Sequence, residues 1–411
     1  MNVFFHTFGC KANQYDTEQV RQAFAATGAT VVDDPALADV AVVNSCTVTA
    51  ESEAKLRRYV GRLARGRREL RTVVMGCAAA LDDGRIAALP SVQAVVGGAE
   101  PTDVLAAAAV TSRLPLTSDV RRLTTGQGRQ RGLLKIQDGC DEHCTFCATT
   151  LARGANRSRS IDDLVAEAHA LGEHHAEIVL TGVHIGTYGQ DRTTENGKRM
   201  TLGGLLEALV AAAPTVRFRL SSIEATEVDD TIARLLIDAP RHIAAHLHAP
   251  LQSGSDRVLK RMGRHWYTAG SYRARLEWLA ERLPVFGLGA DIIAGFPGET
   301  DADHRATLDL VAALPFTYLH VFPFSVRPDA PAAKLGGQLP PPVIKARAAE
   351  LRALGDRKAR AYRERRTGQF ADGVVSGRLA GRVEIVTEDY LSIYLSSAAW
   401  DGRARFAVKV A

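Results

Sequence analysis

The sequence predicts an α/β protein with three parts: an N-terminal parallel α/β domain, a partial barrel of six βα units, and a small C-terminal all-β barrel. Three observations support this prediction. Over residues 1–100, short apolar runs typical of strands alternate with segments that have the periodicity of helices, and the same alternation resumes from Leu133. From Gly368 to Ala411 only short alternating segments remain, with turn residues between them. The chain of 411 residues is long enough for two or three domains.

The N-terminal domain is predicted over residues 1–110. One helix is expected to be capped by Asp16 or Thr17 and to end at Gly28. The strands and helices alternate in a βαβαβ pattern, which predicts a parallel sheet with crossover helices. Residues 111–131 are predicted to be a linker. The expected strands and the second helix are Val3–Phe8, Asp39–Asn44, Thr72–Gly76 and Glu51–Arg68.

The second domain is predicted over residues 132–342. Six βα units in succession favour an open, partial barrel over a complete eight-stranded one. A basic helix is expected at 343–366, and a small all-β barrel at 367–411. The candidate barrel strands are Leu133–Gln137, Glu177–Thr181, Val216–Ser222, Ala245–Ala249, Phe286–Ala294 and Tyr318–Phe324.

The charge distribution is uneven. Hydrophobic residues make up 46% and charged residues 24% of the chain, which excludes disorder on the scale of a domain. The net charge is +5, and residues 345–366 hold nine Lys or Arg against three acidic residues, while residues 57–71 hold seven Arg and one Glu. Each run is either a solvated helix face or a surface that contacts phosphates.

No membrane or secretory segment is expected. The stretch Met1–Gly9 lacks a basic segment followed by an apolar run, and the apolar stretch Val104–Val110 is too short to span a bilayer. We therefore expect a cytoplasmic protein with no membrane partner, in which thiols stay reduced. The six cysteines are then ligands or reactive groups rather than disulfides.

Three cysteines form the motif C-x3-C-x2-C directly after the first barrel strand. Three thiolates at the spacing of Cys140, Cys144 and Cys147 can hold one face of an iron–sulfur cluster. They leave one iron without a protein ligand, free for a small chelating molecule. The alternatives are three buried apolar cysteines or a zinc site, and His143 would be a poor fourth ligand for zinc.

The other three cysteines are far apart in sequence. Cys10, Cys46 and Cys77 each follow a predicted strand, and ligands of parallel sheets collect beyond the carboxyl ends of the strands. Gly9 and Gly76 would let the backbone approach a bulky inorganic group. We therefore expect a second cluster with one open iron, the alternative being core cysteines that are there by coincidence.

The motif at 140–147, with Phe146 before its last cysteine, resembles the radical SAM superfamily. The resemblance implies a [4Fe–4S] cluster at Cys140, Cys144 and Cys147 whose free iron binds S-adenosylmethionine. It also implies that Phe146 packs on the adenine and that the partial barrel is the fold of the superfamily. Thr181, Gly182, Ser222 and Glu224 follow the second and third barrel strands and are expected to contact S-adenosylmethionine.

Over the whole chain the sequence resembles the methylthiotransferases, whose C-terminal barrel is called a TRAM domain. Lys11 and Asn13, together with the stretch 387–391, are similar to the branch that acts on threonylcarbamoyladenosine in tRNA. The chain departs from the usual family pattern at Ala80 and at 148–151. The stretches that carry the resemblance are 7–18, 43–49, 135–140, 246–256 and 295–299.

The resemblance implies methylthiolation at C2 of N6-threonylcarbamoyladenosine next to the anticodon. Two [4Fe–4S] clusters and S-adenosylmethionine would carry the chemistry, without a catalytic side-chain acid or base. The partners implied are the anticodon arm of tRNA, an electron donor such as flavodoxin or ferredoxin, and a sulfur source. The alternatives are methylthiolation of isopentenyladenosine or of a ribosomal-protein aspartate, or a non-catalytic RNA-binding iron–sulfur protein.

Two further side-chain groups are singled out. Arg153 is expected either to contact a carboxylate or to have a structural role. His246 and His248 alternate with Leu247 on a predicted strand, so both face the same side. Hydrogen bonding inside the barrel is the favoured interpretation for the two histidines, and a second metal site is the alternative.

Overall fold

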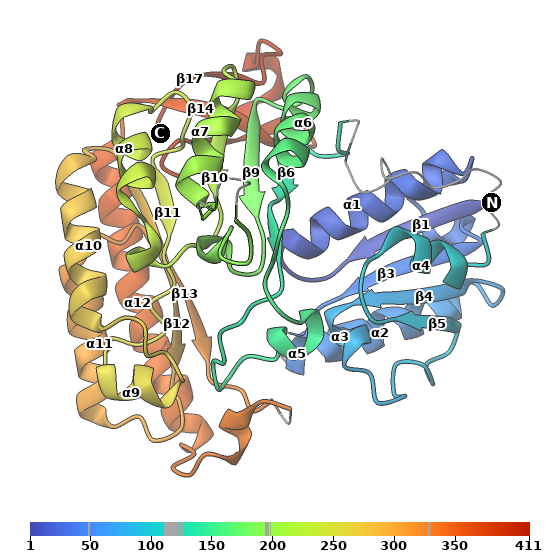
Figure 1. Ribbon diagram of the computed structural model, residues 1–411, viewed down its shortest axis with the longest axis horizontal. Coiled ribbons are helices and arrows are strands. Elements are labelled where there is room, and N and C mark those ends of the chain that lie inside the picture. Colours follow the sequence, from blue (N-terminus) through green and yellow to red (C-terminus); the bar gives the residue numbers. More distant parts are fainter. Residues whose placement is uncertain (48–49, 111–122, 124–125, 194–196, 198, 328) are drawn as a thin grey trace. The chain divides into compact units, whose positions relative to one another are not determined.

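The computed structural model describes residues 1–47, 50–110, 123, 126–193, 197, 199–327 and 329–411 (Figure 1). Most of the predicted linker, 111–122 and 124–125, lies outside the described residues. The chain forms two compact units. The first contains residues 1–125, 137–142 and 147–157, and the second contains residues 126–136, 143–146 and 158–411. The domain boundaries derived from the sequence stay predictions.

The first unit is built on a five-stranded parallel sheet of order β2-β1-β3-β4-β5. Every residue of β3 is buried, because helices cover both faces of the sheet. Val40 and Val42 pack with α1 and α4, whereas Ala41 and Val43 pack with α2. The elements are β1 (Asn2–Thr7), α1 (Lys11–Ala26), β2 (Thr30–Val32), β3 (Val40–Ser45), α2 (Ala50–Gly66), β4 (Arg71–Gly76), α3 (Cys77–Ala80), β5 (Val92–Val96), α4 (Pro101–Ala107), β7 (Gln137–Asp138) and α5 (Thr149–Arg153).

The predicted parallel sheet is confirmed, with two differences. The edge strands β2 and β5 were not predicted, because both are partly exposed and neither forms a continuous buried apolar run. The expected cap of the first helix was wrong. Helix α1 begins at Lys11, five residues before Asp16, and the side chain of Thr17 accepts a hydrogen bond from Thr7 instead (2.8 Å).

The second unit contains the predicted partial barrel. Two three-stranded parallel sheets, β10-β9-β6 and β11-β12-β13, are joined by the parallel bridges Phe218–Ile243 and Ser222–His248. The six strands therefore follow one another in sequence order, which confirms the open barrel. The strands are β6 (Gly132–Lys135), β9 (Glu177–Thr181), β10 (Arg217–Leu220), β11 (His246–His248), β12 (Gly287–Ala294) and β13 (Tyr318–Pro323).

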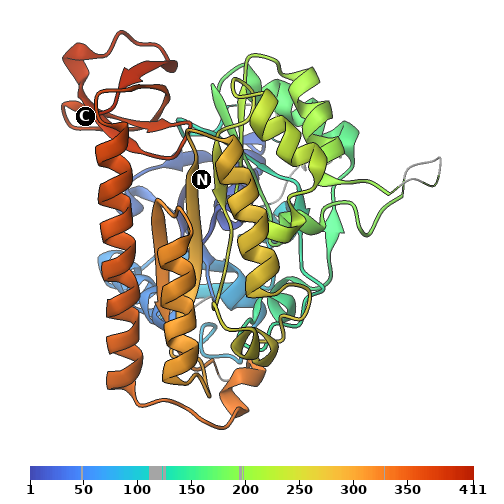
Figure 2. The same ribbon diagram turned by 90° about the vertical axis from the view of Figure 1, so that its left-hand side faces the viewer.

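Helices follow the barrel strands, as the βα pattern requires. The long helix α12 lies along α11 and contacts β13 before it leads into the C-terminal sheet (Figure 2). Strand β8 (Arg157–Ser158) precedes the first of the helices that follow the barrel strands. The helices are α6 (Ile161–Gly172), α7 (Leu202–Ala212), α8 (Asp230–Asp238), α9 (Asp256–Arg261), α10 (Ala269–Arg282), α11 (Asp301–Ala313) and α12 (Pro341–Arg366). None of the described helices is long and apolar enough to cross a membrane.

The C-terminal part is a four-stranded antiparallel sheet of order β16-β15-β14-β17, which confirms the predicted small all-β fold. Its core includes Val375, Ile385, Ile393 and Val408. Strand β14 has 10 residues and is longer than the short alternating segments expected in this region. The strands are β14 (Phe370–Leu379), β15 (Arg382–Thr387), β16 (Ser392–Ser396) and β17 (Arg405–Lys409).

The turn between β15 and β16 closes the amino end of the barrel. A Cβ on Gly287, the first residue of β12, would lie 2.1 Å from the carbonyl oxygen of Asp389, so only glycine fits there. Arg219 of β10 donates to the carbonyl of Thr387 (2.7 Å), and its guanidinium lies over the ring of Tyr390. The stretch 387–391, noted from its resemblance alone, therefore packs against the barrel.

Candidate active site

The first cysteine set lies at the carboxyl edge of the parallel sheet. Cys10 follows β1, Cys46 follows β3, and Cys77 begins α3 directly after β4. The amide oxygen of Asn13 lies 3.6 Å from Cys10 Sγ and 3.9 Å from Cys77 Sγ. A Cβ on Gly9 would lie 3.2 Å from Cys46 Sγ. The three thiols therefore gather around Asn13, as their positions after the strands predicted.

Asn13 and Asn44 fix the loops that carry these thiols. Both side chains are buried. Asn13 Nδ2 donates to the carbonyls of Ser45 (2.8 Å) and Phe8 (3.1 Å), and Asn44 Nδ2 donates to the carbonyl of Asn13 (2.9 Å). Gly76 adopts φ +91°, and a Cβ there would lie 2.2 Å from Asn44 Oδ1. Gly76 thus leaves room for the side chain of Asn44, one of the two asparagines that fix these loops.

Arg153 is a cation beside the first cysteine set. Its Nε donates to Cys77 Sγ (3.2 Å), and its two terminal nitrogens donate to Asn13 (2.7 Å), Asp16 (2.8 Å) and Asp138 (3.0 Å). Burial raises the pKa of the Cys77 thiol, while the charge of Arg153 lowers it. The carboxylates that Arg153 contacts are thus protein side chains, and the guanidinium can stabilise negative charge on sulfur.

The thiols of the second set lie in the loop after β6. The Cys140 N–H donates to the Gly154 carbonyl (3.0 Å), and Cys147 Sγ accepts from the N–H of Thr149 (3.3 Å), both within the first unit. Within the second unit, Cys144 Sγ accepts from Arg264 Nη1 (3.4 Å). Joint ligation of one cluster by the three thiols stays a prediction.

Arg264 links the cluster loop to Glu224. Glu224, predicted from its place after the third barrel strand, is buried and accepts hydrogen bonds from Arg264 and from the indole of Trp266. Arg264 also donates to the Tyr267 hydroxyl (3.0 Å). Burial raises the pKa of Glu224, although the charge of Arg264 opposes this. Glu224 therefore orients the arginine that faces Cys144.

Sequence reasoning missed both Arg264 and Trp266. They follow helix α9 in a loop with no pattern of its own, and only the fold brings them to the carboxyl ends of the strands. Their one local signal is the dense polar and aromatic run at 264–267.

The remaining predicted residues also lie at the carboxyl ends of barrel strands or beside them. Thr181 ends β9, Gly182 follows it, and Ser222 forms a bridge with His248. Phe146 packs edge-on against Phe296, with ring centroids 6.5 Å apart. No contact in the structure tests whether these residues bind S-adenosylmethionine, so that role stays a prediction.

The two barrel histidines form hydrogen bonds inside the barrel, which was the favoured interpretation. His246 Nε2 lies 2.8 Å and His248 Nδ1 lies 3.0 Å from the Tyr318 hydroxyl oxygen. This arrangement confirms that both side chains face the same side of β11.

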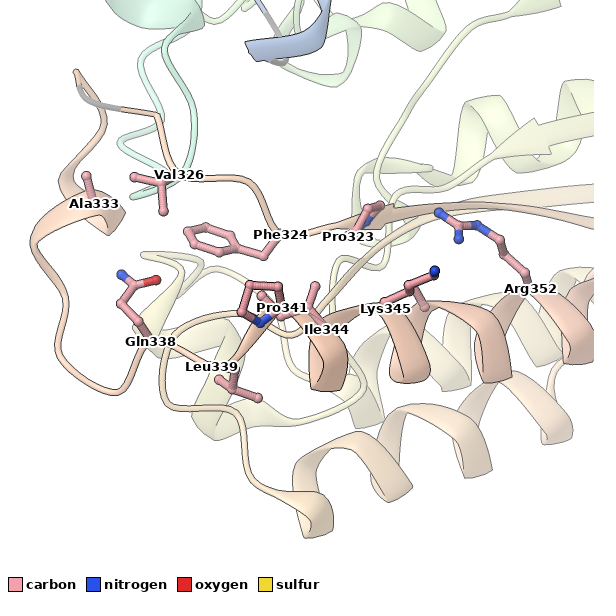
Figure 3. Close-up of a pocket in the computed structure, with 11 residues that line it drawn as sticks. Pro323, Phe324, Val326, Ala333, Gln338, Leu339, Pro341, Ile344, Lys345 and Arg352 are labelled. Carbon is pink, nitrogen blue, oxygen red and sulfur yellow. The ribbon is translucent and has the colours of Figure 1, made fainter.

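A pocket of about 540 Å³ lies between the end of β13 and helix α12 (Figure 3). Phe324, Pro341 and Ile344 contribute apolar walls, and Lys345 and Arg352 contribute positive charge. The lining includes none of the six cysteines and none of the residues expected to contact S-adenosylmethionine, so this pocket is separate from the candidate active site.

Comparison with solved structures supports the fold. A radical S-adenosylmethionine methyltransferase, TsrM, from Kitasatospora setae superimposes with a TM-score of 0.59 and 15% identity. The match covers 81% of this chain and 75% of TsrM. At this identity the similarity establishes the architecture alone.

Sequence comparison identifies the family. Residues 2–97 match the model of the uncharacterized protein family UPF0004, and residues 134–311 match the radical SAM superfamily. Threonylcarbamoyladenosine tRNA methylthiotransferase MtaB of Bacillus subtilis is 37% identical over 88% of this chain and 81% of its own length. Its namesake from Aquifex aeolicus is 32% identical over 96% of both chains. A tRNA-2-methylthio-N(6)-dimethylallyladenosine synthase from Acidithiobacillus ferrooxidans is 34% identical over 92% of this chain and 86% of its own. The chain therefore belongs to the radical SAM methylthiotransferase family.

Proposed function

We propose that this protein adds a methylthio group to C2 of N6-threonylcarbamoyladenosine, next to the anticodon of tRNA. The observation that carries the proposal is the meeting of Cys10, Cys46 and Cys77 beside Arg153, in a chain that also has the radical SAM loop. Similarity to the MtaB enzymes of two bacteria supports this substrate.

The reaction needs a radical because the C2–H bond of adenine is not acidic. No side-chain base has a pKa suited to removing that proton. When bound, two [4Fe–4S] clusters and S-adenosylmethionine would supply the radical, the sulfur and the methyl group. The protein would hold these groups in position and exclude water from them.

The residues around the first cysteine set suit an iron–sulfur cluster. Two of the thiols lie within 4 Å of the Asn13 amide oxygen and the third lies beside Gly9, so the three would provide three ligands and leave one iron open. The Arg153 N–H group that points at Cys77 Sγ would offset the negative charge of a thiolate cluster. Asp16 and Asp138 would keep the guanidinium in this orientation.

The second set would hold the cluster that binds S-adenosylmethionine through Cys140, Cys144 and Cys147. Arg264 would play the part at Cys144 that Arg153 plays at Cys77, since it donates to the sulfur and is oriented by a buried acid. Phe146, beside Phe296, offers an apolar surface for an adenine ring. Thr181, Gly182, Ser222 and Glu224 would then contact the rest of the molecule.

Helix α12 and the C-terminal sheet would bind the tRNA. Not every arginine of the basic helix is available for phosphates: Arg347 is buried in ion pairs with Glu299 and Asp301, and Arg366 in pairs with two acids of the β15–β16 turn. The exposed Arg357, Arg360 and Arg365 would contact the tRNA backbone, in a salt-dependent manner. An electron donor such as flavodoxin or ferredoxin, a sulfur source and a cytoplasmic location complete the proposal.

Two cysteine variants separate the roles of the clusters. After anaerobic reconstitution, the wild type should bind roughly eight irons, and Cys10→Ala and Cys144→Ala should each bind fewer, down to about four. Cys10→Ala should still cleave S-adenosylmethionine but form no methylthio product, whereas Cys144→Ala should do neither. A wild type with about four irons would remove the first-set cluster from the proposal.

Nucleoside analysis of tRNA from cells with and without the gene tests the substrate. Loss of the methylthio form of threonylcarbamoyladenosine is expected. The similarity to a dimethylallyladenosine synthase makes the isopentenyl nucleoside the second candidate. If only the methylthio form of isopentenyladenosine were lost, that nucleoside would be the substrate. If the tRNA were unchanged, a ribosomal protein would be the substrate to test.

A further inference from the structure

A column of polar side chains lines the inside of the partial barrel on β11, β12 and β13. The Tyr318 hydroxyl is hydrogen-bonded to His246 Nε2 (2.8 Å) and to His248 Nδ1 (3.0 Å). His248 Nε2 lies 2.9 Å from Asp291 Oδ1, and His320 Nδ1 lies 3.2 Å from the same oxygen. The column thus runs without interruption from His246 to His320.

The strand register builds this column. Gly289 pairs with Tyr318 and Asp291 pairs with His320, and each pair is two residues from the other on its strand. All four therefore face the same side of the sheet. A Cβ on Gly289 would lie 2.0 Å from the Tyr318 ring, so glycine provides the space in which the tyrosine lies. Leu319, of opposite parity, faces α12 at Gly355.

One set of donors satisfies every bond in the column. His246 Nε2–H donates to the Tyr318 oxygen, the Tyr318 hydroxyl donates to His248 Nδ1, and His248 Nε2–H and His320 Nδ1–H both donate to Asp291. Burial would raise the pKa of Asp291, but the hydrogen bonds from His248 and His320 hold it well below its usual range. Asp291 is therefore an ionised acceptor, and it fixes the ring of His320 with Nε2 pointing away from the carboxylate.

The column is open at one end. The His320 side chain is 56% exposed, against 25% for Asp291 and 9% for His248. His320 is therefore the member of the column that can meet a ligand. Three groups face it: Asp291 of β12, His248 of β11, and Tyr318 of its own strand β13.

On the basis of the proposed function, we propose that His320, held by Asp291, binds the carboxylate end of the N6 substituent of the target adenosine. With Nδ1–H donated to Asp291, His320 would offer Nε2–H to the substrate carboxylate, since an imidazolium donates through both of its ring nitrogens. A charge-assisted hydrogen bond then forms. An apolar isopentenyl group would instead desolvate His320 Nε2 without offering it a hydrogen-bond partner, so His320 would select against that substrate.

The test uses reconstituted full-length protein and anticodon stem–loops that carry threonylcarbamoyladenosine, its neutral methyl ester or isopentenyladenosine. His320→Phe keeps a ring of similar size but removes both nitrogens. It should lower kcat/KM for the threonylcarbamoyl stem–loop by about 10–100-fold and change that for the methyl ester by much less. Cleavage of S-adenosylmethionine and iron content should not change. His169→Phe, an exposed histidine on α6, is the matched control and should behave as the wild type.

A second variant guards against misfolding. His320→Gln keeps an N–H donor and should retain more of the preference for the charged substrate than His320→Phe does. Equal kcat/KM for the wild type and His320→Phe on the threonylcarbamoyl stem–loop would overturn the role of His320 while leaving the proposed function intact. A wild type inactive on that stem–loop but active on isopentenyladenosine would overturn the proposed function and this inference with it.

A metal ion is the rival explanation for the same three donors. His248, Asp291 and His320 offer two imidazoles and one carboxylate with ligand atoms within 4.8 Å of one another, a set that suits divalent transition metals. About one zinc or manganese per wild-type chain, lost in His320→Phe, would overturn direct contact between His320 and the substrate. Absence of such an ion from the active wild type is the expected result.

Discussion

Glu177 holds a buried ion cluster together, and its replacement by glutamine should weaken the whole second unit. The carboxylate is fully buried in β9 and accepts from Arg217 Nε (2.6 Å), Arg219 Nε and Nη2 (both 3.0 Å) and Arg131 Nη1 (3.1 Å). Arg217 and Arg219 are buried as well, and they also donate to backbone carbonyls of β14 and of the last residue of β15. Glu177→Gln keeps the shape of the side chain but removes the negative charge that these guanidinium groups share, although Arg217 retains its ion pair with Asp372 (3.1 Å).

The expected loss is about 3–5 kcal/mol, the range for removing one partner of a buried ion pair. Glutamine retains one oxygen acceptor, so the loss should be smaller than four charge-assisted hydrogen bonds would suggest. Glu207 provides the matched control. It pairs with Arg234 at 2.5 Å, but both side chains are 52% exposed. Glu207→Gln should therefore cost about 0–1 kcal/mol.

Urea unfolding and hydrogen exchange of β14 and β15 amides would measure this difference, because Arg217 and Arg219 attach that sheet to the barrel. Burial would raise the pKa of Glu177, but Arg219 and Arg217 hold it well below its usual range. The stabilisation is thus present above the pKa of an unfolded glutamate and is lost as the pH falls through the folded value. The difference in unfolding free energy between the wild type and Glu177→Gln should therefore become smaller at acidic pH. Equal unfolding midpoints for Glu177→Gln and Glu207→Gln at pH 7 would refute the reasoning.

Three further predictions concern single side chains. Arg153→Met should reduce the iron retained by the first cysteine set, and Arg153→Lys should restore part of it. Unchanged iron content in the methionine variant would show that the guanidinium is dispensable. Asp303→Asn should destabilise the N-terminus of α11 by about 1–2 kcal/mol at pH 7. The hydrogen bonds that it accepts from Arg257, Ser255 and Thr300 lower its pKa despite burial, so the difference should vanish in acid. Asp309→Asn, at an exposed position of the same helix, is the control and should change the stability at pH 7 by no more than about 0.5 kcal/mol in thermal unfolding. Gly289→Ala should cost about 1–3 kcal/mol, since the added methyl group would overlap a tyrosine ring. A thermal midpoint equal to that of the wild type would contradict the packing.

The strands of the fold could be predicted from the sequence with useful precision, because buried parallel strands are short apolar runs with polar ends. The predicted Glu177–Thr181 matches β9, and the expected Tyr318–Phe324 exceeds β13 by one residue. The edge strand β2 has only three residues and gives no such signal. The start of α1 was missed because no side chain caps it, and its first turn is fixed instead by long-range bonds of Asn13.

The candidate site, like the fold, could be predicted from the sequence only in part. That three cysteines follow three strands and three more share one loop could be predicted from the sequence alone, because strand ends and loop spacing are local properties. The side chains that surround these thiols depend on tertiary packing. Arg153 reaches Cys77 across 76 positions, and Arg264 reaches Cys144 across 120. The column from His246 to His320 likewise depends on the register of three strands, since a shift of one residue would turn each side chain to the opposite face. Such contacts arise from how segments pack, and no local pattern in the chain encodes them.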